Sequence, residues 1–276
     1  MVSIRLRLML GMALLVGCAG LLESPEFGWA GEREAPILVA PGSSPTPQPT
    51  DPAQATLLQR LQAVMPEVAV DWIKPGPIPG LYTMKAGRSI VYMDASGRYL
   101  FAGGIFDLQA QVNLTALVQG QEAVAQLWGG PLADLAIPLG EADRPDKEIA
   151  VFDDVDCPYC KRLHPEIDKL VQAGWRVWVL LYPVQKLHPH AYSKSVGIWC
   201  AEDRPDALRR VWSGERAGEK NCAHPLDRIQ ALAQQVGVAG TPTMVLKSGI
   251  VIQGYHNAES IVSMSRPQSA AVAEKP

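Results

Sequence analysis

The stretch Cys157-Pro158-Tyr159-Cys160 decides how the rest of the chain is interpreted. It follows an apolar run at residues 149–152, which is typical of a strand, and it opens a helical pattern from Lys161 to about Ala173. The first thiol lies where unpaired backbone N–H groups and the positive end of the helix dipole stabilise a thiolate. The second thiol lies one turn later, within disulfide reach of the first. The stretch therefore predicts a redox-active pair.

The region around this stretch has the pattern of an α/β domain. A βαβ unit is predicted here: a strand from Glu148, the helix after the cysteines and a strand at 175–182. A helical block at 191–236 follows, with interruptions near 204–205 and 214–218. Two strands at 243–247 and 251–253 and a short helix at 259–264 complete the domain, which we place at 147–265.

A smaller α+β unit is predicted ahead of it, at 53–113. Apolar spacing indicates a helix over 54–64, and four β-like runs follow at 68–72, 81–85, 89–93 and 99–102. A unit of about 60 residues buries too little surface to be stable alone, so we expect dimerisation through a sheet edge. A connecting helix at 114–127 and a looser segment fill the linker region at 114–146.

The N-terminus indicates export. Arg5 and Arg7 precede an apolar segment at 8–17 that is too short to span a bilayer. The following Leu15-Val16-Gly17-Cys18 resembles a bacterial lipobox, which implies a lipoprotein signal peptide over 1–17 and lipidation of Cys18. An ordinary signal peptide cleaved near Ala30 is the alternative. We expect a periplasmic protein, anchored by lipid to the outer membrane in the first case.

Two segments are predicted to lie outside any folded core. Residues 18–52 contain many Pro, Ser, Thr and Gly residues and are expected to form an extended tether, and residues 266–276 a disordered tail. The formal net charge of −3 and the lack of a basic stripe give no indication of nucleic-acid binding.

The pattern around the cysteines resembles the thioredoxin fold. Gly240-Thr241-Pro242 stands ahead of the final hairpin, and Pro165 lies five residues after Cys160, where the family has a proline that kinks its first long helix. The resemblance implies that Pro242 is cis and lies beside the active-site cysteines. A Cys-x-x-Cys pair alone leaves zinc binding open, but no second pair has ligand spacing and the histidines form no evident cluster. We therefore expect no metal and no cofactor.

More narrowly, the chain resembles the DsbC/DsbG group of periplasmic disulfide isomerases over about residues 53–264. The shared stretches are 151–154, Leu163-His164, Ile198-Trp199-Cys200-Ala201 and 237–242. The resemblance implies a V-shaped homodimer, in which cystatin-like dimerisation domains form the base and thioredoxin-like domains with a helical insertion form the arms. It also implies exported substrates with wrong disulfides and a DsbD-like membrane reductase as the electron donor.

Within that group the motifs diverge. Pro158-Tyr159 between the cysteines resembles DsbG, whereas Cys200 and Cys222 fall where DsbC has a second, structural disulfide. The alternative for Cys200 is a buried free thiol beside Trp199. The resemblance thus favours a DsbC-like protein with a DsbG-like dipeptide.

The residues and the resemblance together predict disulfide isomerase and reductase activity. Cys157 is the expected nucleophile, exposed and activated, and Cys160 the resolving cysteine. Pro242 should shape the substrate groove, and Thr241 either tunes the thiolate or only packs there. The alternatives are a chaperone-like or partner-docking envelope protein, an oxidase, and a DsbG-like reductase of single oxidised cysteines.

Charges near the cysteines act in opposite directions. Asp153, Asp154 and Asp156 should raise the pKa of Cys157, whereas Lys161 and Arg162 should lower it. His164 is expected on a solvated face of the helix and outside the site.

Overall fold

The computed structural model describes residues 51–265, in which a five-stranded sheet forms the centre of the larger domain. Its strands are β7 (Ile137–Leu139), β8 (Glu148–Asp153), β9 (Arg176–Leu181), β10 (Thr243–Leu246) and β11 (Val251–Gln253). Their order across the sheet is β11-β10-β8-β9-β7, and only the β8–β9 pair is parallel. The central strand β8 is apolar and buried along nearly its whole length, as expected of a strand covered on both faces.

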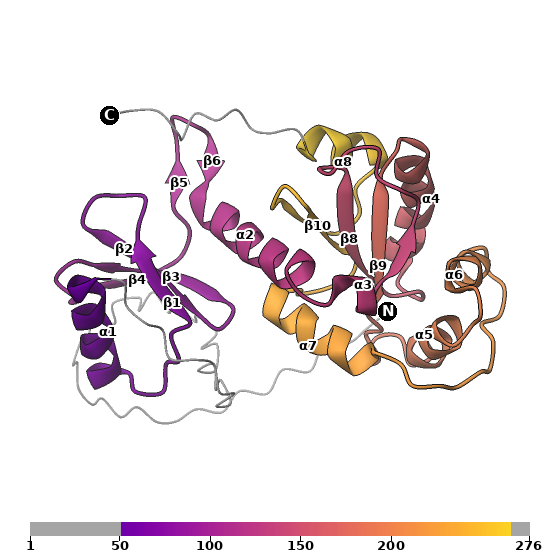
Figure 1. Cartoon of the computed structure of the whole chain (residues 1–276), viewed down its shortest axis with the longest axis horizontal. Helices are drawn as coiled ribbons and strands as arrows, with labels where there is room; N and C mark the ends of the chain where they lie inside the picture. The colour runs from indigo at the N-terminus through magenta and orange to yellow at the C-terminus, as the bar shows by residue number, and fades with distance from the viewer. Residues whose placement is uncertain (1–50, 266–276) are drawn as a thin grey trace, which may run out of the picture. The chain divides into compact units, whose positions relative to one another are not determined.

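Helices cover this sheet in two groups (Figure 1). The helices α4 (Pro158–Gln172) and α8 (Ala258–Ser265) pack against each other, while α2 (Leu114–Trp128) packs with α7 (Leu226–Val236). One continuous apolar core joins the sheet to both groups, and it includes Ala123 and Leu127 of the connecting helix. The expected α/β fold with a βαβ unit around the cysteines is therefore present.

The helical insertion between β9 and β10 contains α5 (Ala191–Trp199), α6 (Arg204–Trp212) and then α7. A disulfide joins Cys200 to Cys222, so the closed loop holds the whole of α6. The backbone of this loop passes very close to α5: a Cβ at Gly197 would lie 2.0 Å from the carbonyl oxygen of Gly218. Only a glycine leaves room for that approach.

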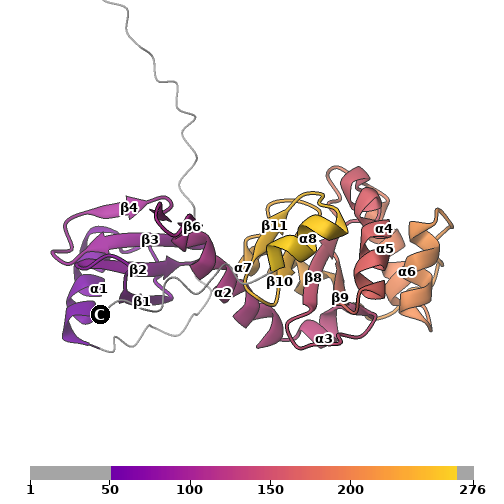
Figure 2. The ribbon, with the colours of Figure 1, turned by 90° about the horizontal axis from the view of Figure 1, so that it is seen from above.

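A second, four-stranded antiparallel sheet lies in the N-terminal part of the described chain. Its strands follow the order β1 (Trp72–Pro75), β2 (Leu81–Ala86), β3 (Ser89–Asp94) and β4 (Leu100–Ala102). Helix α1 (Pro52–Val64) begins at Asp51, whose side chain accepts hydrogen bonds from the first turn, and lies on one face of the sheet (Figure 2). Leu57, Leu58 and Leu61 form a separate small core with apolar residues of β1, β2 and β3.

Several elements differ from the sequence expectations. The first strand lies at Trp72–Pro75 and not at 68–72, because its register is fixed by pairing with β2. The segment expected to be loose contains α3 (Leu132–Leu135) and the edge strand β7, and a short hairpin of β5 (Phe106–Asp107) and β6 (Val112–Asn113) was not predicted. Pro165 lies inside helix α4, as expected.

Some predictions concern residues that the structure does not describe. Four predicted features lie outside the described residues: the signal peptide at 1–17, Cys18, the 18–52 tether except its last two residues, and the tail at 266–276. Within residues 51–265, none of the helices is both long and apolar enough to cross a bilayer.

Candidate functional site

Cys157 occupies the N-cap position of α4, directly after the turn that follows β8. Pro158 stands in the first helical turn, where its missing N–H removes no hydrogen bond. The N-cap position places Cys157 at the positive end of the helix dipole, although its side chain makes no capping hydrogen bond. The expectation of an exposed Cys157 is wrong, because only 5% of its surface is accessible.

The loop before β10 lies against this sulfur. The Thr241–Pro242 peptide bond is cis, as the fold resemblance implied. The Cys157 thiol donates to the Thr241 carbonyl oxygen at 3.4 Å, which accounts for its burial. The loop is held on both sides, since the Thr243 hydroxyl donates to the Gly240 carbonyl at 2.7 Å and the Gly254 amide donates to the Pro242 carbonyl at 2.8 Å.

Cys160 is completely buried beneath Cys157, and both are free thiols. The backbone N–H of Asp154 donates to its sulfur at 3.5 Å. Burial raises the pKa of the Cys160 thiol far above its usual range and the Asp153 carboxylate raises it further, which outweighs the hydrogen bonds from Asp154 and Thr241. Cys160 is therefore protonated at neutral pH and must lose its proton before it can attack.

The three aspartates ahead of the pair each have partners of their own. Asp156 pairs with Lys194 at 2.6 Å and with Lys161 at 3.6 Å. Burial would raise the pKa of this carboxyl, but the Lys194 hydrogen bond and the two lysine charges outweigh it and lower the pKa. The carboxylate of Asp156 is thus already neutralised beside Cys157.

Asp154 is fully buried and anchors the loop after β9. Its carboxylate accepts from the Val184 amide at 2.7 Å and faces Nδ1 of His188 at 2.8 Å. That loop carries Leu187, an exposed apolar side chain, and Tyr159 between the cysteines is also exposed.

Asp153 and His164 form a buried pair at the C-terminal end of β8. Nε2 of His164 lies 2.9 Å from Oδ1 of Asp153, and the indole N–H of Trp212 donates to Oδ2 at 3.4 Å. The imidazole stacks on the Trp212 ring with centroids 4.1 Å apart and 12° between the planes. His164 was expected on a solvated face, which is wrong: only 4% of it is exposed, because α6 covers that side of α4.

Two protein-family models match the chain. The disulfide bond isomerase protein N-terminal domain matches residues 48–116, and the thioredoxin-like domain matches residues 141–266. The thiol:disulfide interchange protein DsbC of Escherichia coli strain K12 is 29% identical over 185 residues, which are 66% of this chain and 75% of that protein. The chain belongs to the DsbC-type thiol:disulfide interchange proteins.

Further relatives show the same likeness. The DsbC of Dickeya dadantii is 28% identical over 72% of this chain and 82% of that protein. A solved disulfide interchange protein of Neisseria gonorrhoeae is 32% identical, with a TM-score of 0.45 over 49% of this chain and 96% of that one. The thioredoxin-like domain and these DsbC relatives show that the chain is a thiol-disulfide oxidoreductase of the disulfide isomerase type, and its thioredoxin-like domain holds the free thiols Cys157 and Cys160.

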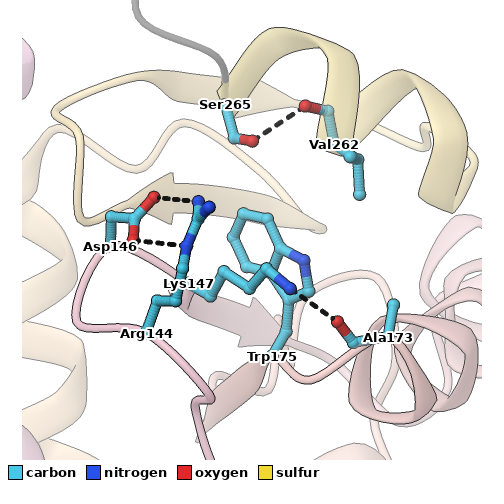
Figure 3. A pocket seen from close by; sticks show the side chains of 7 residues that line it. All are labelled: Arg144, Asp146, Lys147, Ala173, Trp175, Val262 and Ser265. Carbon is cyan, nitrogen blue, oxygen red and sulfur yellow. Dashed lines mark hydrogen bonds and ion pairs between the residues drawn. The ribbon is translucent and has the colours of Figure 1, made fainter.

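A pocket of about 290 Å³ lies at the other end of β8 (Figure 3). Arg144 is paired with Asp146 at 2.6 Å, and Lys147 with Asp143 at 2.8 Å and with the Ala173 carbonyl at 3.0 Å. Lys147 precedes β8 and Cys157 follows it, so a six-residue strand of about 20 Å separates the pocket from the cysteines. The charges lining this pocket are already paired, and we place it outside the candidate site.

Sequence reasoning placed the cysteines and the cis-proline loop but missed the groups around them. Across residues 51–265, no three His, Cys, Asp or Glu side chains are arranged to bind a metal ion. The missed groups are His164, Trp212, His188 and Lys194. His164 did carry a usable signal, since it stands four residues after the buried Cys160 and therefore on the same helix face.

Proposed function

We propose that Cys157 is the nucleophile and Cys160 the resolving thiol of a periplasmic isomerase that acts on exported proteins with wrong disulfides. The observation that carries this proposal is the placement of Cys157 at the N-terminus of α4, against the Thr241 carbonyl and above a buried, protonated Cys160. Cys157 would therefore attack the substrate first, and Cys160 would react only in the resolving step.

The isomerase cycle is redox-neutral. The Cys157 thiolate attacks one sulfur of a substrate disulfide, so that a mixed disulfide forms and the other substrate sulfur leaves as a thiolate. That thiolate attacks a second disulfide in the substrate and liberates a third sulfur. When this sulfur attacks the substrate side of the mixed disulfide, the rearranged substrate leaves and the Cys157 thiolate is regenerated.

Reduction is the second outcome of the same intermediate. The Cys160 thiolate attacks the Cys157 sulfur and breaks the mixed disulfide, so the substrate leaves with two thiols and the protein holds the Cys157–Cys160 disulfide. Two electrons have then passed to the substrate. A membrane reductase of the DsbD type would return them.

Pro242 and Thr241 would position the substrate. The Thr241 carbonyl faces the Cys157 sulfur, and the two hydrogen bonds within 240–254 hold the loop in place. An extended substrate segment would displace the thiol from this carbonyl and pair with the same stretch of backbone.

The test uses the reduced protein and a scrambled, disulfide-rich substrate. Cys157→Ser should lower the isomerase rate by about a thousandfold or more, because a hydroxyl is far less nucleophilic than a thiolate at neutral pH. Cys160→Ala should keep the first step and accumulate mixed disulfides on Cys157, visible by mass spectrometry. Isomerase turnover retained by Cys157→Ser would overturn the mechanism.

A chaperone-like role is the second candidate, and the exposed Tyr159 and Leu187 favour it. Suppression of aggregation that is undiminished in a Cys157→Ser/Cys160→Ser double variant, together with negligible disulfide exchange in the parent, would favour this role over the enzyme.

We further propose a homodimer formed through the N-terminal unit at 53–113, which a linker at 114–146 joins to the catalytic domain at 147–265. Strand β4 is an edge of its sheet, and all three of its residues are exposed, with Phe101 at 53%. An exposed apolar edge is a site for pairing with another strand. Light scattering at micromolar concentration should give twice the chain mass, and Phe101→Asp should lower it; a monomeric parent would overturn the proposal.

Lipidation of Cys18 is proposed from the lipobox-like stretch alone. Mass spectrometry of the mature N-terminus would show an acylated cysteine, whereas an unmodified start near residue 31 would refute the lipid anchor.

A further inference from the structure

The Asp153–His164 pair is a buried titratable group that disulfide exchange, as described so far, does not use. Asp153 ends β8, His164 lies on α4, and Trp212 at the end of α6 contacts both. Three separate elements therefore converge on one carboxylate in the core of the domain. A buried charge costs free energy, so this arrangement calls for an explanation.

With Asp153 ionised, the hydrogen bonds indicate which atoms carry protons. An indole N–H can only donate, so Oδ2 of Asp153 accepts from Trp212. For the ionised Oδ1 to accept as well, Nε2 of His164 must carry its hydrogen. The neutral imidazole then has a bare nitrogen at Nδ1, and this atom is buried without a hydrogen-bond partner among the described residues.

Cys160 stands one helical turn before His164 on the same face of α4. Its thiol must be deprotonated to attack the mixed disulfide, yet burial and the Asp153 charge hold its pKa high. The resolving step therefore requires an acceptor for the proton within the buried site.

The other charged groups nearby already have partners. The Asp154 carboxylate is engaged by His188 and by the Val184 and Asp156 amides. Further pairs surround the site from the packed elements: Asp156 with Lys161 and Lys194, Glu166 with Lys169, and Arg209 of α6 with Asp168 of α4. Among these groups, Nδ1 of His164 is the nitrogen that has no hydrogen-bond partner and can accept a proton.

We propose that the Asp153–His164 pair, positioned by Trp212, accepts the Cys160 proton in the resolving step. This inference rests on the proposed function. The proton leaves the Cys160 sulfur and reaches Nδ1 of His164 through one bridging water molecule, because no hydrogen bond joins the two atoms directly; the imidazolium that results is stabilised by the Asp153 carboxylate. The Cys160 sulfur forms its bond to the Cys157 sulfur, and the bond between Cys157 and the substrate breaks. The departing thiolate takes a proton from water, and His164 later returns its proton to water.

The two steps can be separated with an aromatic disulfide reagent that releases a coloured thiolate. Attack by Cys157 releases the first equivalent, and attack by Cys160 releases the second. Asp153→Asn and His164→Gln should slow the second release by about tenfold or more and move its pH profile to higher pH. The first release should stay within about twofold of the parent rate.

Asp153→Asn changes the rate of the second thiol release in opposite directions under two mechanisms: general-base assistance, as proposed, and a purely electrostatic effect of the Asp153 charge. If the Asp153 charge acted only by raising the pKa of Cys160, Asp153→Asn would lower that pKa and accelerate the second release. An accelerated or unchanged second release would overturn the inference. Absence of the first release in the parent would instead defeat the proposed function itself.

A second histidine provides a matched control. His224 also has a buried Nδ1 without a hydrogen-bond partner among the described residues, but its ring lies edge-on against Tyr192 of the helical insertion. His224→Gln should leave the second release within about twofold of the parent, because general-base assistance would reside in His164 alone. An equal slowing in this control would count against the proposal.

A measurement on the parent protein covers the case in which the variants do not fold. Nitrogen-15 NMR of the histidine side chains in the reduced full chain should show His164 with a proton on Nε2 and none on Nδ1 at neutral pH. A proton on Nδ1 under those conditions would overturn the proposal without any substitution.

Discussion

Strand β8 has a carboxylate at each end, and the two ends differ in the partner that faces it. Glu148 at the start accepts from the indole N–H of Trp128 at 3.1 Å and of Trp178 at 2.7 Å, and it pairs with Lys247. Asp153 at the end also faces a tryptophan N–H, but its second partner is a histidine. Lysine keeps its charge throughout the neutral range, whereas histidine changes its charge there.

This difference suggests that the two carboxylate–tryptophan arrangements have different roles. At the start of β8, a permanent ion pair joins the linker helix α2, strand β9 and the turn after β10. At the end of β8, the partner can take up a proton next to the resolving cysteine. The first end should govern stability, and the second should govern the rate of disulfide chemistry.

The largest effect on stability is expected from the disulfide that encloses α6. Cys200→Ser/Cys222→Ser should lower the free energy of unfolding by about 3 kcal/mol, because the unfolded chain is no longer restrained by a closed loop. Since Trp212 lies inside that loop, the resolving step should slow as well. Urea unfolding and the two-step thiol release measure these effects; a variant as stable as the parent would contradict the first.

A smaller loss is expected where α2 meets the turn between β10 and β11. A Cβ at Gly120 would lie 1.6 Å from the carbonyl oxygen of Gly249, so Gly120→Ala must move the helix or the turn. We expect a loss of about 2 kcal/mol from overpacking, with both thiol-release rates nearly unchanged. Gly218→Ala is the matched control, since its Cβ would meet open space. Equal stability of the two variants in urea would refute this packing argument.

Removing the charge of Glu148 tests directly whether the two ends of β8 differ in role. Glu148→Gln keeps an acceptor oxygen for the indoles but takes the carboxylate away from Lys247, whose side chain is one-third exposed. The expected loss is about 1.5 kcal/mol of stability, typical of one charged hydrogen bond. The second thiol release should keep its rate, in contrast to Asp153→Asn. A slowed release in Glu148→Gln would erase the distinction between the two ends.

The elements that sequence reasoning predicted well are those with strong local signals. The Cys157 helix, the βαβ unit and the proline loop each follow from periodicity or from a short motif, and the structure has all three. Strand β7 has only three residues, and it becomes a strand through pairing with β9, which no local pattern reveals.

The site was predicted less completely, because its missing parts come from distant segments. His164 was judged by its position on α4, whereas Trp212 from α6 and Asp153 from β8 both lie against its ring in the fold. Cys157 was expected to be exposed because nothing in the sequence shows that the Thr241 carbonyl covers it. The partners Lys194 of Asp156 and His188 of Asp154 stand 38 and 34 residues away from them in the chain.

The smallest expected effect is the loss, in acid, of the stability that Glu148 contributes at the start of β8. Burial alone would raise the pKa of Glu148, but the hydrogen bonds from Lys247, Trp178 and Trp128 and the lysine charge outweigh it, so the pKa is lowered. A carboxyl whose pKa is lower in the folded state adds stability that is complete above its unfolded value and disappears as the pH falls through its folded value. The stability gap between the parent and Glu148→Gln should therefore be full at neutral pH and shrink below about pH 4. Urea midpoints of both proteins at neutral and acidic pH measure it. A gap that stays constant or widens in acid would show that the Glu148 charge does not stabilise the fold.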